Sequence, residues 1–266
     1  MILRAGREEL PRLTALWQTC FGDRPEEIEV FWKIFGKTVD VFCAKEGKDI
    51  AAMVCAMVCA LPAQLVDESG ESHPAAYLYA VATAPAYRRR GLCGKVLAFA
   101  EAALRKEGVS YALLVPSEPP LFDLYRRYGY RTVAFRGAEK IFSAPCAGTV
   151  QEIDAEAYFN LRELLLYENF LSCGPDFLRY QAIDDRLCRI ETAQQVFCAV
   201  CAQKDGRLTI KELLPYDPAA AALLLQASGA QRGVCLTPEG PLPYAMGKAL
   251  RGDALPQNLY FGLAMD

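Results

Sequence analysis

The chain has 266 residues, of which 53% are hydrophobic, and its 29 Lys and Arg residues stand against 32 Asp and Glu residues, for a formal charge of −3. This composition supports a full core in one large domain or two ordinary ones and excludes a mainly disordered chain. The near-neutral charge argues against a dedicated nucleic-acid binder, which would be clearly basic. No apolar run reaches the roughly 18 residues of a membrane span, and no secretory segment opens the chain, so we expect no membrane partner and a cytoplasmic location.

Eleven cysteines and a single histidine, His73, limit the chemistry that the chain can perform. The cysteines lie mostly in apolar runs, which is typical of buried, reduced thiols and not of a secreted disulfide scaffold. Cys198 and Cys201 have the spacing of a redox or zinc pair, but a strand would point them to opposite faces. We therefore expect no metal site and no Ser-His-Asp or Cys-His catalysis.

The first half of the chain alternates strand and helix patterns. Periodicity and turn residues predict strands at 2–4, 39–45, 50–61, 75–83, 111–115 and 131–142, and helices at 10–21, 23–36, 91–107 and 121–128. Asp23 and Glu26 have the spacing of a capping box at the start of the second helix. This order predicts an α/β fold, a mixed sheet with helices on both faces.

After a predicted linker at 143–148 the pattern partly repeats. Helices are predicted at 154–167, 175–182 and 217–228, a hairpin at 196–213 and a strand at 234–237. The apolar run 260–265 reads as a last strand drawn into the fold. We therefore expect two α/β domains, residues 1–144 and 145–266.

The segment after the strand at 75–83 carries the clearest chemical signal. A turn with Pro85 leads into three arginines and two glycines, Gly91 and Gly94, at the start of a helix. The unpaired N–H groups and the positive dipole end of a helix N-terminus attract anions, and glycines let a ligand approach the backbone. The segment therefore predicts a site for a phosphate-bearing ligand, although it is neither a P-loop nor Gly-x-Gly-x-x-Gly.

Two motifs in this order resemble the GNAT superfamily of acyl-CoA N-acyltransferases. The first, Arg88-Arg89-Arg90-Gly91-Leu92-Cys93 followed by Gly94, is similar to the family's Arg/Gln-x-x-Gly-x-Gly/Ala, with Cys93 as a departure. The second, Tyr125-Arg126-Arg127-Tyr128-Gly129-Tyr130, is similar to Tyr-x-x-x-Gly-Phe/Tyr. The resemblance covers about residues 1–142, and the run at 116–118 and the C-terminal extension are loosely similar to the enhanced-intracellular-survival branch.

The resemblance implies an N-acetyltransferase that moves an acetyl group from acetyl-CoA to a primary amine of a small molecule or peptide, through a tetrahedral intermediate. In such enzymes the strand before the arginines separates from its neighbour, and its backbone binds the pantetheine arm and stabilises the oxyanion. The pyrophosphate lies on the backbone that follows. Carried over to this sequence, the cofactor-binding residues are Val81, Ala82, Thr83, Arg88, Arg89, Arg90, Gly91, Leu92, Cys93, Gly94, Ser117 and Glu118.

For the catalytic groups, the resemblance implies Tyr125 as the general acid. A phenol with a pKa near ~10 is protonated at neutral pH and can donate to the departing CoA thiolate. The strand glutamate that many members use as a base is missing, because Tyr77 and Tyr79 stand in that region. The alternatives left open are the carboxylate of Asp266, as in the branch named above, Glu118 through water, and no base at all.

The second half imitates the cofactor-binding core, but its turn Pro215-Tyr216-Asp217 has neither glycine nor arginine. Asp217 at a helix N-cap would place a negative charge where a pyrophosphate must lie. We therefore expect a degenerate GNAT-like domain that binds no CoA. A non-catalytic acyl-CoA-binding protein is the alternative function, and nucleic-acid binding through the arginines is a weaker one. The amine acceptor and the oligomeric state cannot be predicted from the sequence.

Overall fold

The computed structural model describes residues 1–47, 53–142, 144, 146–252 and 254–265. The chain divides into two compact units, each with its own internal contacts. The first unit comprises Met1–Leu65, Ser72–Arg131 and Met246–Leu255, and the second comprises Val66–Glu71, Thr132–Ala245 and the residues from Pro256 onward. The units thus interleave along the chain, whereas the sequence analysis expected a single boundary after residue 144.

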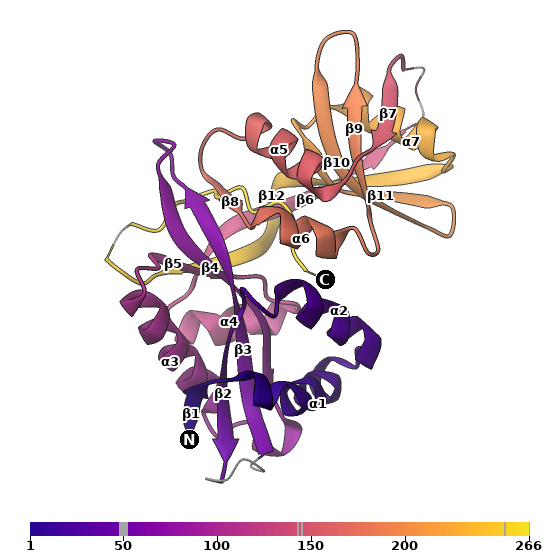
Figure 1. Ribbon diagram of the computed structural model, residues 1–266. Helices are drawn as coiled ribbons and strands as arrows, with labels where there is room; N and C mark the ends of the chain where they lie inside the picture. The colour runs from indigo at the N-terminus through magenta and orange to yellow at the C-terminus, as the bar shows by residue number, and fades with distance from the viewer. Residues whose placement is uncertain (48–52, 143, 145, 253, 266) are drawn as a thin grey trace. The chain divides into compact units, whose positions relative to one another are not determined.

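The first unit is a mixed sheet with four α-helices (Figure 1). Its strands are β1 (Ile2–Arg4), β2 (Asp40–Glu46), β3 (Met53–Val66), β4 (Ser72–Thr83) and β5 (Tyr111–Leu114). Its helices are α1 (Leu10–Phe21), α2 (Pro25–Phe35), α3 (Leu92–Lys106) and α4 (Pro119–Arg127), with short 3-10 turns η1 (Arg7–Glu9) and η2 (Pro85–Tyr87). The sheet runs β1-β2-β3-β4-β5, and β5 is parallel to β4.

Helices cover both faces of this sheet, as the sequence predicted. Neighbouring residues of a strand point to opposite faces. Leu78 of β4 packs with Val96 of α3 in one buried cluster. Tyr79 points to the other face, where its ring lies 5.5 Å from the ring of Trp17 on α1 and 5.7 Å from that of Phe31 on α2.

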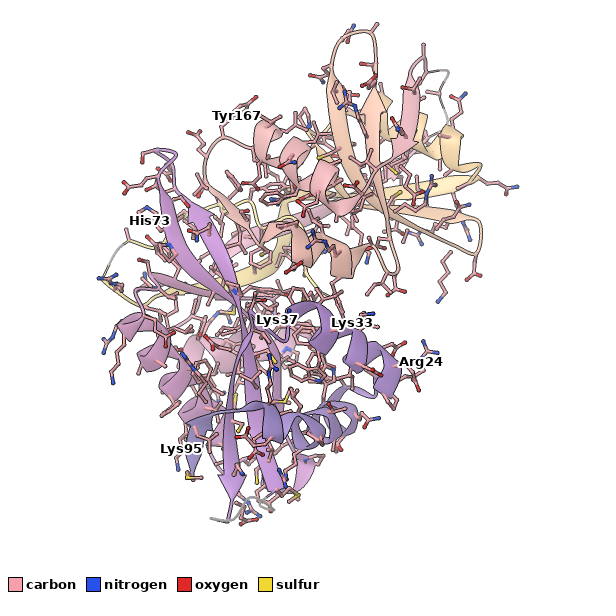
Figure 2. The ribbon with its side chains drawn as sticks, viewed as in Figure 1. Arg24, Lys33, Lys37, His73, Lys95 and Tyr167 are labelled. Atoms are coloured by element: carbon pink, nitrogen blue, oxygen red, sulfur yellow. The ribbon has the colours of Figure 1, made fainter. Side chains whose placement is uncertain are left out.

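The start of α2 differs by one residue from the prediction. Arg24 is the N-cap, and the side chain of Glu27 closes the capping box by accepting a hydrogen bond of 2.8 Å from the Arg24 backbone N–H. Asp23 is not the cap because its carboxylate accepts a hydrogen bond of 2.7 Å from the indole of Trp17. Arg24 projects outward at this end of the helix (Figure 2).

The second unit is also α/β. Its strands are β6 (Arg131–Ile141, of which Arg131 lies in the first unit), β7 (Thr149–Glu152), β8 (Phe170–Ser172), β9 (Arg186–Glu191), β10 (Val196–Lys204), β11 (Arg207–Leu214) and β12 (Arg232–Ala249). Its helices are α5 (Ala155–Leu165), α6 (Gly174–Gln181) and α7 (Pro218–Ser228). The sheet runs β7-β9-β10-β11-β12, β6 pairs with β12, and α7 connects the parallel strands β11 and β12.

Several strands of this half were not predicted. β7, β8 and β9 carry too few apolar residues in alternation to indicate strands, and β12 extends far beyond the expected strand at 234–237. The run at 260–265 is wrong as a strand over the residues described, where only an isolated bridge joins Tyr260 to Phe170. Its burial is as expected, since Phe261 and Leu263 are 3% and 4% exposed.

The end of β12 belongs to the first unit. Residues Met246–Ala249 pair antiparallel with Leu114–Tyr111 of β5. Met246 is fully buried and joins the cluster of Leu78 and Val96 together with Leu250. A strand from the second half of the sequence therefore completes the sheet that carries the candidate site. Among the described helices, none is long and apolar enough to cross a membrane.

Candidate active site

Strands β4 and β5 separate at the candidate site. Their parallel pairing covers Ala75–Tyr77 against Tyr111–Leu113, and no later pair joins the two strands in the described residues. Ala80 then has a φ of +50°, a left-handed conformation that L residues rarely adopt. The kink separates the paired part of β4 from the residues predicted to hold the pantetheine arm, Val81, Ala82 and Thr83. Their backbone therefore lies beyond the last paired residues of the two parallel strands.

The connection from β4 to α3 presents backbone groups at the N-terminus of the helix. Gly91 is the N-cap with a φ of +73°, no side chain caps the helix, and a Cβ at Gly91 would meet nothing within 4 Å. The first N–H groups of a helix have no partner within it. The amides of Leu92 and Cys93 are therefore uncapped N–H groups at the positive end of the α3 dipole.

The three arginines before Gly91 are exposed and differ in their contacts. The Arg88 side chain donates to the carbonyl oxygen of Thr83 at 3.1 Å, which ties the turn to the end of β4. The Arg90 guanidinium lies 4.8 Å from the ring centre of Tyr87, and Arg89 has a φ of +62°. The exposed Lys95 on the first turn of α3 (Figure 2) adds a fourth positive charge to this short stretch of the chain.

Gly94 differs from Gly91 in its surroundings. The space that a side chain would take at Gly94 is already occupied by another residue of the protein, whereas the same space at Gly91 is empty. A Cβ at Gly94 would lie 2.6 Å from Cε1 of Tyr128. We expected Gly94 to let a ligand approach the backbone. In the structure it instead allows α3 to pack closely against Tyr128 at the end of α4. Beside it, burial raises the pKa of the Cys93 thiol to about 11, against the effect of a hydrogen bond with Tyr128. Cys93 is thus a neutral, small residue.

Tyr125 lies in the same region on α4. It is 6% exposed, and its ring stands 5.9 Å from that of Tyr130. Burial raises its pKa above the ordinary value, and the neighbouring Cys93 and Tyr128 add to the shift. These causes place Tyr125 beside the first turn of α3. Its hydroxyl makes no hydrogen bond to another residue in the described part of the chain. The phenol is protonated, and its hydrogen is free to be donated to a bound ligand.

Ser117 and Glu118 are both exposed and follow β5 directly. Glu118 is the N-cap of α4, and its carbonyl oxygen accepts a hydrogen bond of 3.0 Å from the N–H of Leu121. Since β4 and β5 are parallel, their carboxyl ends lie at the same edge of the sheet. The structure thus brings these two residues to the edge that carries Val81–Thr83 and Gly91. Asp266 lies outside the described residues.

Two residues missed in the sequence analysis, Lys248 and Glu101, hold the motif at 125–130 in place. The Lys248 ammonium donates to the carboxylate of Glu101 at 2.6 Å and to the backbone oxygen of Tyr128 at 2.8 Å. The hydroxyl of Tyr130 donates to the same carboxylate at 2.9 Å. The small and apolar residues around Lys248 could have indicated a strand. Nothing local in the sequence indicates that this strand pairs with β5.

Comparison with known proteins agrees with this geometry. The family described as acetyltransferase (GNAT) domain matches residues 2–133. No curated protein matches the chain. A probable N-acyltransferase from Enterococcus faecalis V583 has a similar structure, with a TM-score of 0.76 and 17% identity over 94% of this chain and 72% of that one.

Two further solved structures share the fold. Eis1 from Mycobacterium abscessus has a TM-score of 0.68 and 14% identity, over 94% of this chain and 74% of that one. A tandem GNAT protein from the clavulanic acid biosynthesis pathway has a TM-score of 0.56 and 9% identity, over 96% of this chain and 99% of that one. At such identities these likenesses concern the fold. Residues 2–133, the first half of the chain, match the model of the acetyltransferase (GNAT) domain family.

Proposed function

We propose that the protein is an N-acetyltransferase that moves an acetyl group from acetyl-CoA to a primary amine of a small molecule or peptide. The observation that carries this proposal is the meeting of three features at the carboxyl ends of β4 and β5. They are the end of pairing between the two strands, the uncapped helix start at Gly91, and the hydroxyl of the buried residue Tyr125.

The donor would bind mainly through backbone groups. The pyrophosphate would lie on residues 89–94, beside the exposed arginines, and the pantetheine arm along Val81–Thr83. Ser117 and Glu118 would border it. The fit is supported by two observations: a Cβ at Gly91 would meet nothing within 4 Å, and residues 84–94 contain no carboxylate to repel phosphates.

In the reaction, the amine nitrogen attacks the thioester carbonyl carbon, and a tetrahedral oxyanion forms. A backbone N–H of Val81–Thr83 would stabilise this charge with a preorganised hydrogen bond. When the carbon–sulfur bond breaks, Tyr125 would give its proton to the sulfur. The nitrogen loses a proton to a base, for which we propose the carboxylate of Asp266, with Glu118 through water or bulk solvent as alternatives. The products are the amide and CoA.

The alternative function, acyl-CoA binding without turnover, is favoured by one specific observation. β4 carries no carboxylate, and the ring of Tyr79 packs with α1 and α2 on the opposite face from Leu78. A built-in base on that strand is therefore lacking. We propose acetyl-CoA and an unidentified amine as the partners, without nucleic acid or membrane, and the eleven free thiols support a reducing, cytoplasmic location.

The test is CoA release with acetyl-CoA and a panel of primary amines, followed with a thiol reagent. Tyr125→Phe is expected to lower kcat by ~10²-fold or more while the Kd for acetyl-CoA stays the same. Tyr111→Phe is the matched control, because Tyr111 is equally buried and its hydroxyl donates to the carbonyl oxygen of Ala254. Binding of acetyl-CoA without thiol release for any amine would support the alternative function.

A further inference from the structure

The second unit repeats the strand–helix–strand arrangement of the candidate site. β11 and β12 are parallel and connected by α7, as β4 and β5 are connected by α3. Their pairing covers Arg207–Ile210 against Arg232–Cys235. Beyond these residues the strands separate, so the second unit contains a wedge of its own, which we call the second wedge, between residues 211–214 of β11 and 236–238 of β12.

The second wedge is filled by the end of the chain. We call residues 256–265 the C-terminal segment. A residual cavity of about 20 Å³ is lined by Lys211 and Leu213 of β11, by Leu236 and Thr237 of β12, and by residues 259–262 of the C-terminal segment. Such a volume has room for about one water molecule. The segment therefore occupies the space that separates the two strands.

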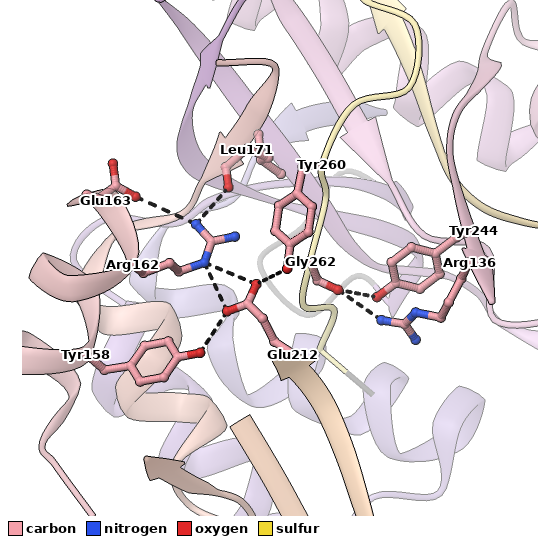
Figure 3. Close-up of polar contacts among 9 residues, drawn as sticks. All are labelled: Arg136, Tyr158, Arg162, Glu163, Leu171, Glu212, Tyr244, Tyr260 and Gly262. Atoms are coloured by element: carbon pink, nitrogen blue, oxygen red, sulfur yellow. Dashed lines mark hydrogen bonds and ion pairs between the residues drawn. The ribbon is translucent and has the colours of Figure 1, made fainter. Parts of the chain in front are cut away.

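A buried carboxylate on β11 binds the C-terminal segment through a hydrogen bond. Glu212 is 1% exposed and accepts hydrogen bonds from the hydroxyl of Tyr158 at 2.9 Å and from that of Tyr260 at 3.0 Å (Figure 3). The guanidinium of Arg162 donates to it at 3.1 Å. Burial disfavours the charged form of Arg162, but the pKa of its guanidinium is raised because the Glu212 carboxylate, Tyr260 and Tyr158 together outweigh that effect. Tyr260 is thus tied to a charged pair inside the unit.

Gly262 shows how closely the segment fits. Its φ is +68°, and a Cβ there would lie 2.3 Å from Oε1 of Glu212 and 2.9 Å from Nη2 of Arg162. Its carbonyl oxygen accepts a hydrogen bond of 2.9 Å from Arg136, and Figure 3 shows this contact beside the carboxylate. Two backbone hydrogen bonds just before Gly262, from the N–H of Leu259 to Val133 of β6 and from the N–H of Leu171 to Tyr260, hold the segment in register.

The second wedge is also unsuited to a phosphate-bearing ligand. The connection that leads from β11 to α7 is only Pro215–Asp217, in place of residues 84–91 in the first unit. The Asp217 carboxylate accepts a hydrogen bond of 2.8 Å from the N–H of Ala220, so it covers the start of α7 with negative charge.

We infer that the second wedge is a docking site for the chain's own C-terminal segment, which takes the place of an acyl-CoA. The segment is an intramolecular ligand of the second unit. Its Tyr260 and Gly262 are held by the buried Glu212 carboxylate and by the Arg136 guanidinium. Each chain therefore binds one acyl-CoA, a corollary that rests on the proposed function of the first unit.

The direct test is hydrogen–deuterium exchange of residues 256–265, read by mass spectrometry on the intact chain. Gly262→Ala is expected to speed exchange there about tenfold or more, because the added methyl group displaces the segment from Glu212. Gly229→Ala is the matched control, since Gly229 has the same φ of +68° and a Cβ there would meet nothing within 4 Å. Tyr260→Phe, which removes only the hydroxyl, serves as a milder variant if Gly262→Ala does not fold.

Two results of the exchange experiment would overturn the docking. The first is that residues 256–265 of the native chain exchange as fast as an unstructured peptide. The second is that these residues exchange at the same rate in Gly262→Ala and Gly229→Ala. Calorimetric titration with acetyl-CoA supplies a separate reading. One acetyl-CoA per native chain and none in Gly91→Glu supports the inference, whereas one remaining site in Gly91→Glu contradicts it. A native chain that binds no acetyl-CoA would contradict the proposed function, and the exchange result would still decide the docking.

Discussion

Lys248 donates a hydrogen bond of 2.8 Å to the backbone oxygen of Tyr128, although the two residues are 120 positions apart in the sequence. Tyr128 ends the helix that carries Tyr125, and its ring packs against Gly94 on α3. The proposed general acid is therefore held in place by a residue from the strand that completes the first unit. The second half of the sequence contributes directly to the site of the first.

Replacing Lys248 tests this support. Lys248→Met should lower the free energy of unfolding by about 1–3 kcal/mol, because the carboxylate of Glu101 and the backbone oxygen of Tyr128 each lose a charged donor. Urea unfolding measures the change. The control, Lys37→Met, replaces an exposed lysine (Figure 2) and should stay within about 0.5 kcal/mol of the native chain. Equal stability of the two variants would contradict the role given to Lys248.

The completion of the first sheet by β12 can be tested through its core. Met246→Ala should destabilise the protein by about 2–5 kcal/mol, since Met246 is fully buried against β5. Met53→Ala, at a position that is 53% exposed, should change little. Thermal unfolding compares them. For the same reason a fragment of residues 1–144 should fail to unfold cooperatively, and a stable, cooperative fragment would show that the strand is dispensable.

The elements around the site could be predicted because their signals are local. The helix start at Gly91 and the motif at 125–130 follow from glycines, arginines and apolar spacing within a few residues. The kink at Ala80 and the packing of Tyr128 on Gly94 could not be predicted. Both depend on tertiary contacts, and no local pattern in the sequence indicates them. The pairing of Met246 with Leu114 is likewise invisible to periodicity, because it joins segments that are far apart in the chain.

The pH dependence of turnover follows from the burial of Tyr125. Because burial raises the pKa of this phenol above its ordinary ~10, its proton is retained throughout neutral and mildly alkaline solution. We expect kcat to show no alkaline fall from Tyr125 below about pH 10. Rate profiles of the native enzyme and Tyr125→Phe measure this. A fall near pH 9 that disappears in Tyr125→Phe would contradict the assignment.

The thiol of Cys93 should be unreactive at neutral pH. Burial raises its pKa to about 11, so only a very small fraction is the thiolate that attacks alkylating reagents. With iodoacetamide at pH 7.5, Cys93 should be modified at least ~10-fold more slowly than Cys146, because the raised pKa of Cys93 keeps its thiol protonated although both residues are partly exposed. Peptide mass spectrometry over time compares the two sites. Modification of Cys93 first would contradict the protonated thiol described for this turn of α3.

The central claim is that the start of α3 binds the phosphates of acetyl-CoA, and calorimetric titration tests it most directly. Gly91→Glu places a carboxylate in the open space at the helix N-terminus, whereas Gly22→Glu makes the same change at another glycine with positive φ and nothing within 4 Å of a Cβ. We expect micromolar binding by the native chain and by Gly22→Glu, and none by Gly91→Glu. Binding by Gly91→Glu at native affinity, or no binding by the native chain, would contradict the account.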